Sequence, residues 1–115
     1  MRDITIKFIA QRRQRYDTAG DYWIDNRGTI QVRISKEKDW RYEVLVLIHE
    51  LTEMFLCKER GISFKAIDRF DMRFRGDGEP GDDPKAPYYR EHQWASGIER
   101  LLAAELGVDW KDYER

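Results

Sequence analysis

The first third of the chain has the alternating pattern of a β-strand region. Ile4, Ile6 and Phe8 alternate with Thr5 and Lys7. A period of two places the apolar side chains on one face, so this segment is expected to be a half-buried strand.

A second strand signal is a pair of apolar segments, residues 22–24 and 30–34, on either side of a polar stretch. That stretch contains Asn26 and Gly28, which tolerate positive φ angles and therefore favour a tight turn. We expect the two segments to form an antiparallel β-hairpin.

The remainder of the chain has helical character. Residues 40–60 contain no Pro or Gly and are apolar almost all round their middle, which predicts a helix that runs through the core and ends at Gly61. A shorter helix is expected over residues 64–74. A last helix is expected over residues 88–106, with Gly107 ending it.

The segment 75–87 holds all three prolines of the chain and is expected to be a loop. It lacks the ligand pattern of an EF-hand. In the tail, Trp110 is expected to pack back onto the body. With strands first and helices after, the predicted class is α+β: a small antiparallel β-sheet, made of the strand and the hairpin, packed on the helix of residues 40–60 with two further helices. A single domain over residues 1–115 is expected.

Composition narrows the classes of function. The net charge of −1 gives no electrostatic reason to expect a nucleic acid or an anionic membrane as partner. The longest apolar run, residues 44–48, is far too short for a membrane span. Cys57 is the only cysteine, which excludes an internal disulfide. No apolar leader follows Met1, so we expect a soluble, cytoplasmic protein.

The chemistry of the chain is concentrated in His49-Glu50-Leu51-Thr52-Glu53, inside the apolar helix. Carboxylates there need a partner, because burying an unpaired charge is costly. Residues i and i+4 share a helix face, so His49 and Glu53 can bind one metal ion. Glu50 lies about 100° round the helix, beside that pair, where a general base would be placed. Zinc, or another divalent metal, is the predicted cofactor.

A third ligand is needed to close the site. His92, the only other histidine, is the first choice. Glu91 is the alternative, because it aligns with the apolar face of its helix, and both could bind. Asp68 and Asp71 are candidates for holding a histidine N–H, although such residues are more often solvated. Cys57 is expected to be a small buried hydrophobic residue.

These motifs resemble two groups of proteins. The helix with its H-E-x-x-E motif resembles a minimal zincin-like metallohydrolase, with Glu in place of the second His of H-E-x-x-H. The wider pattern is similar to small, uncharacterised phage-associated proteins. The segments that carry this second resemblance are Gln14–Asp21, Ile48–Glu53, Asp82–His92, Ile98–Arg100 and Ala104–Gly107. The zincin resemblance implies His49, Glu53 and His92 as metal ligands and Glu50 as the catalytic base.

Three functions remain open from the sequence. The first is a zinc-dependent hydrolase, a metallopeptidase acting on a peptide or protein through a metal-activated water with Glu50 as general base. The second is a non-enzymatic, metal-stabilised phage accessory or interaction module. The third is a carboxylate-bridged two-metal site that would use Glu50, Glu53 and Glu91 besides the histidines.

Overall fold

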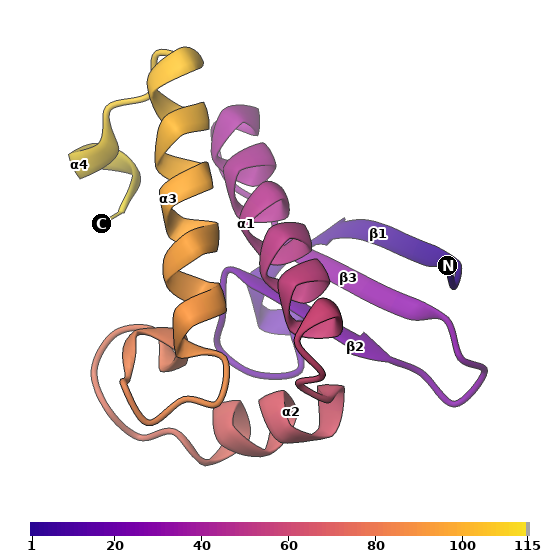
Figure 1. Ribbon diagram of the computed structural model, residues 1–115. Helices are drawn as coiled ribbons and strands as arrows, with labels where there is room; N and C mark the ends of the chain where they lie inside the picture. Colours follow the sequence, from indigo (N-terminus) through magenta and orange to yellow (C-terminus); the bar gives the residue numbers. More distant parts are fainter. Residues whose placement is uncertain (115) are drawn as a thin grey trace.

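The computed structural model describes residues 1–114 and consists of a three-stranded sheet followed by helices (Figure 1). The strands are β1 (Ile4–Ile9), β2 (Gly20–Ile24) and β3 (Ile30–Ser35), and the helices are α1 (Trp40–Glu59), α2 (Phe64–Arg73), α3 (Tyr89–Glu105) and α4 (Trp110–Tyr113). Short 3-10 turns occupy Gln11–Arg13 and Pro80–Asp82. The α+β class is confirmed. The expected domain of residues 1–115 extends one residue beyond the described part.

The sheet is mixed rather than antiparallel. Its strand order is β1-β3-β2. The hairpin of β2 and β3 is antiparallel as expected, with Gly28 at a φ of 83° in its turn. β1, however, pairs in parallel with β3, with Ile4 opposite Ile30. The expectation of an all-antiparallel sheet was wrong for β1, because an alternating pattern does not indicate which neighbour a strand takes. The expected half-buried face was also wrong for Ile6 and Phe8, which are 40% and 39% exposed.

Helix ends lie where the sequence places them. Asp39 caps α1 by accepting a hydrogen bond from the backbone N–H of Arg41. Gly61, just beyond the end of α1, has a φ of 71°, and Gly107 beyond α3 has the same value. Ser63 caps α2 through the N–H of Ala66. These caps fix where α1 and α3 begin and end, and so which of their side chains face each other.

α1 packs against α3 and also against β2 and β3 (Figure 1). Its buried residues include Leu45, His49, Glu53 and Cys57, which recur every four residues and form one line along the helix. Most of its other apolar residues are only half-buried, and Phe55 is 39% exposed. The helix therefore has a narrow buried line rather than the all-round burial that its composition suggested.

α3 presents a matching line to α1. His92, Ala95, Glu99 and Ala103 are its buried residues on this line. The two alanines have almost no exposed surface, and their small side chains allow close approach of the helix backbones. As a result, the polar residues of both lines lie opposite one another within the helix interface.

The core has two parts. The larger lies between the sheet, α1 and α2 and includes Val32 and Ile34. The smaller is formed by Leu45, Ala103 and Val108, with Trp110 packed against it. This second part confirms the expectation that the tail returns to the body. Within residues 1–114, none of the helices has the length and apolar character that crossing a membrane requires.

Leu45→Ala is expected to lower the free energy of unfolding by about 2–5 kcal/mol, because Leu45 is fully buried and links α1 to the C-terminal part of the core. Urea unfolding followed by circular dichroism measures the loss. Leu101→Ala is the matched control, since Leu101 is 71% exposed and should change stability by less than about 0.5 kcal/mol. Equal losses in the two variants would contradict the packing described.

Candidate metal centre

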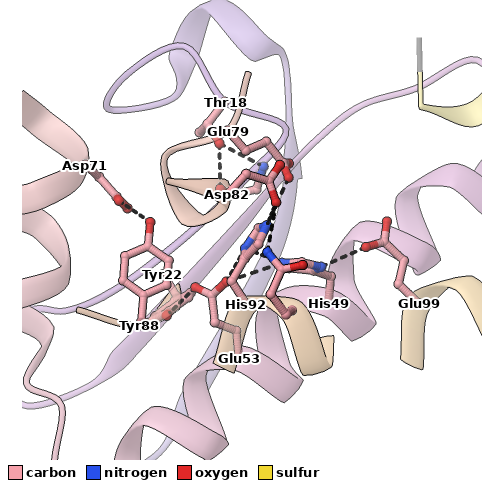
Figure 2. Close-up of polar contacts among 12 residues, drawn as sticks. Thr18, Tyr22, His49, Glu53, Asp71, Glu79, Asp82, Tyr88, His92 and Glu99 are labelled. Carbon is pink, nitrogen blue, oxygen red and sulfur yellow. Dashed lines mark hydrogen bonds and ion pairs between the residues drawn. The ribbon is translucent and has the colours of Figure 1, made fainter. Parts of the chain in front are cut away.

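Three side chains from α1 and α3 converge on one point. His49 Nε2 lies 3.1 Å from His92 Nδ1 and 3.3 Å from Glu53 Oε2, and His92 Nδ1 lies 2.9 Å from the same oxygen. Figure 2 shows the three side chains pointing toward one another. All three residues are at least nine-tenths buried, with 4–6% of their surface exposed. This arrangement brings together the ligands expected from the zincin-like resemblance.

The separations fit a shared ion. Donor atoms bound tetrahedrally to one zinc at about 2.1 Å lie about 3.4 Å apart, and the three observed distances are close to that value. Two ring nitrogens at 3.1 Å make at best one hydrogen bond, whereas both can bind a cation through their lone pairs. His49, Glu53 and His92 therefore satisfy the requirements of a three-ligand site.

The carboxylate of Glu99 contacts the ring nitrogen of His49 that faces away from Glu53 and His92. Glu99 Oε1 lies 2.7 Å from His49 Nδ1, so this ring N–H donates to the carboxylate, and Nε2 is the nitrogen that could bind an ion once its own proton is displaced. The hydroxyl of Tyr113 in α4 donates to the other oxygen of Glu99. A histidine whose second nitrogen donates to a carboxylate is the usual arrangement at zinc sites.

Glu53 is held in a similar way. The hydroxyl of Tyr22 in β2 donates to Glu53 Oε1 at 2.6 Å, so only Oε2 faces the two histidines. Burial alone would raise the pKa of Glu53, but the hydrogen bonds from His49 and His92 outweigh it and lower the pKa to about 2. Glu53 is therefore ionised at neutral pH.

The histidines show the opposite shift. Burial lowers the pKa of His49, but the hydrogen bonds to Glu53 and Glu99 more than compensate and raise it to about 11. Burial also lowers the pKa of His92, but the interactions with Glu53 and Glu79 outweigh it and raise the pKa to about 10. Without a metal, these imidazoles therefore hold protons at neutral pH, and an ion must displace them.

Glu91 lies outside this cluster. It is buried, as its place on the helical wheel indicated, but its carboxylate forms an ion pair with Arg60 at 2.9 Å. Of these two neighbours, His92 is therefore the one that lies in the cluster with His49 and Glu53. The carboxylate-bridged alternative that used Glu91 loses one of its ligands for the same reason.

The residues considered as supports have other roles. Asp68 forms an ion pair with Arg15, which also pairs with Asp21. Asp71 accepts hydrogen bonds from two tyrosine hydroxyls and contacts neither histidine. Cys57 is buried, as expected, and burial raises the pKa of its thiol to about 12.

A cavity of about 40 Å³ adjoins the cluster. It is lined by polar groups, including the carboxylates of Glu50, Glu53 and Asp71. A cavity of this volume has room for water. Burial, together with the nearby charges of Glu53 and Glu79, raises the pKa of Glu50 well above its ordinary value. Burial likewise raises the pKa of Asp71, to about 6, although its tyrosine partners oppose the shift.

Two glycines allow the loops to approach the site. A Cβ on Gly81 would lie 2.4 Å from two atoms of the His92 ring. A Cβ on Gly20 would lie 2.7 Å from Glu50 Cγ and from Val46 Cγ1. Such distances are not tolerated between real atoms, so a side chain at either position would displace the histidine or the glutamate.

The sequence reasoning missed four residues of the centre: Tyr22, Glu79, Asp82 and Glu99. Glu99 carried a usable signal, because it lies two turns after His92 on the same face of one helix. Tyr22, Glu79 and Asp82 come from a strand and a loop, and their positions depend on tertiary structure. Comparison of the chain with known protein families, with curated proteins and with solved structures gave no match.

Gly81→Ala is expected to displace the His92 ring and to lower the free energy of unfolding by about 1–3 kcal/mol, because the added methyl group has no space. Urea unfolding measures the loss, and the imidazole NMR signals of His92 report the displacement. Gly97→Ala is the control: nothing lies within 4 Å of its Cβ position, so the helix should gain about 0.5–1 kcal/mol. Unchanged histidine signals in Gly81→Ala would contradict the close contact.

Proposed function

We propose that this protein is a zinc-dependent hydrolase in which His49, Glu53 and His92 hold the metal and Glu50 is the general base. The observation that carries the proposal is the convergence of three buried donor atoms at separations of 2.9–3.3 Å. The contact of His49 Nδ1 with Glu99 adds to it, because a histidine whose other nitrogen donates to a carboxylate is the usual arrangement at zinc sites.

The proposed mechanism assigns a separate task to each group. A bound zinc ion supplies Lewis acidity and lowers the pKa of water. Glu99 keeps the Nδ1 proton of His49 in place, so that Nε2 remains a ligand. Tyr22 holds one oxygen of Glu53 and thereby directs the other toward the histidines.

Glu50 moves the proton. Glu50 lines the cavity beside the ligands, and burial raises its pKa, which makes its ionised carboxylate a stronger proton acceptor. It would then deliver that proton to the leaving group. A carboxylate of raised pKa in a cavity beside possible metal ligands supports a role in acid–base chemistry.

The substrate class rests on the resemblance of the H-E-x-x-E helix to zincin-like enzymes. On that basis we propose a peptide or protein substrate. The buried, unpaired Cys57 is compatible with a reducing compartment, and the proposal places the enzyme in the cytoplasm.

A second candidate function is a metal-stabilised interaction module without catalysis, such as a phage accessory protein. The enclosure of the centre favours it, because the ligands are at least nine-tenths buried and the adjoining cavity is only about 40 Å³. In that case the ion would hold α1 against α3, and Glu50 would be dispensable.

High-affinity zinc binding is the first test. Glu53→Gln is expected to weaken it at least about 100-fold, because a charged ligand is lost. Titration in competition with a chromophoric chelator gives the affinity. Glu59→Gln, an exposed change on the same helix, should leave the affinity unaltered. If wild type, Glu53→Gln and Glu59→Gln bind zinc with equal affinity, the metal centre is excluded.

The pH dependence of zinc binding is the second test. The pKa values of about 11 for His49 and about 10 for His92 mean that both hold protons at pH 7 in the metal-free protein. Affinity should therefore rise with pH from 6 to 8, by up to about 100-fold per unit if two protons are displaced. Proton release measured in a weakly buffered solution gives the number of protons displaced by each bound zinc ion. An affinity independent of pH would show that the histidines are not ligands.

Glu50→Gln is expected to retain zinc and to lower hydrolysis of a casein or peptide-library substrate by about 100-fold or more, because the proton acceptor is lost. Glu59→Gln serves as the control for activity as well. If Glu50→Gln is as active as wild type, Glu50 is not the base. If wild type binds zinc but cleaves nothing, and a chelator lowers its melting temperature, the interaction module is favoured.

A further inference from the structure

His92 has a second nitrogen that the proposed metal centre does not use. Nδ1 faces His49 and Glu53, whereas Nε2 points to the loop before α3, where Glu79 Oε2 lies 3.3 Å away and Asp82 Oδ1 lies 3.2 Å away. Figure 2 shows these two carboxylates on the opposite side of the ring from Glu53. The ring is 4% exposed, so Nε2 is an inner atom at the base of this acidic pair.

The contacts have the distance of a hydrogen bond but not its direction. Within residues 1–114, His92 Nε2 is a buried atom without a hydrogen-bond partner. Donor atoms that share an ion lie about 3.2–3.4 Å apart and off each other's lone-pair axes, whereas an N–H···O bond needs alignment. The arrangement of Nε2 with the two oxygens thus fits a shared ion, which would replace the proton that the metal-free ring carries.

Within residues 1–114, the ionic partner of the two carboxylates is His92. Neither forms an ion pair with a Lys or Arg side chain, and the additional polar contact is that of Gln93 Nε2 with Asp82 Oδ1 at 3.2 Å. The side chains of Glu79 and Asp82 are 64% and 58% exposed, so an ion can reach them from solvent. Two oxygens and one imidazole nitrogen suit a borderline divalent cation such as zinc.

We propose that Glu79, Asp82 and His92 Nε2 form a second, outer divalent-cation site, and that His92 bridges the outer and inner ions through its two nitrogens. A ring bound at both nitrogens carries neither N–H proton, and the displaced protons pass to solvent. Glu53, Glu79, Asp82 and this imidazolate then supply four negative charges, which equal the charge of two divalent ions. Gly81 makes the site possible, because a side chain there would collide with the His92 ring.

The experiment is a zinc-binding isotherm by equilibrium dialysis, with elemental analysis of the full-length chain. Wild type is expected to bind two ions, and the Glu79→Gln/Asp82→Asn double variant one. The control double variant, Asp77→Asn/Glu105→Gln, removes the same charge from exposed positions and should bind two. His49→Ala should keep one ion through the outer site, and it should lose that ion when Glu79→Gln and Asp82→Asn are added.

Other outcomes decide against the outer site. If wild type saturates at one ion that Glu53→Gln abolishes, the inner centre is retained and the outer site is wrong; Glu79 and Asp82 would then only orient His92. If the double variant still binds two ions, the residues are misassigned. If Cu²⁺ replaces zinc, two bridged copper ions should give a weaker paramagnetic resonance signal than two isolated ones. A full, additive signal would overturn the bridge.

Discussion

The structure depends on compensation of charge between two packed helices. α1 and α3 bury His49 and Glu53 against His92 and Glu99, with at most 8% of any of these residues exposed. Each such charge would cost several kcal/mol if it were buried alone. They are tolerated because each has a partner across the interface, and the small Ala95 and Ala103 let the helices come close enough for those partners to meet.

The same compensation explains why the centre extends outward in layers. Tyr22 and Tyr113 donate to the outer oxygens of Glu53 and Glu99, and they come from the sheet and from the C-terminal helix. The sheet and α4 therefore both contribute to the orientation of the inner side chains of α1 and α3.

The fold could largely be predicted from local signals. Asp39, Gly61 and Gly107 mark helix ends through backbone chemistry that depends only on neighbouring residues, and the hairpin turn is set by Gly28. The direction of β1 could not be predicted, because strand pairing is decided by the route of the chain through residues 10–19. For the candidate metal centre, the i,i+4 spacing was sufficient to predict that the side chains of His49 and Glu53 meet. Glu79 and Asp82 could not be found, because a loop with little regular structure has no period to interpret.

The hydrogen bond from Tyr113 to Glu99 has a consequence for synthesis of the protein. Counted from His49 to Tyr113, the centre spans more than half of the sequence. While the ribosome still holds the final helix in its exit tunnel, Glu99 lacks its tyrosine and the His49 ring is less firmly held. A nascent chain can thus fold its sheet and α1 early, but Glu99 gains its hydrogen bond from Tyr113 only when α4 has emerged. The order of synthesis would therefore delay the full ordering of the His49–Glu99 pair until the surrounding fold is in place.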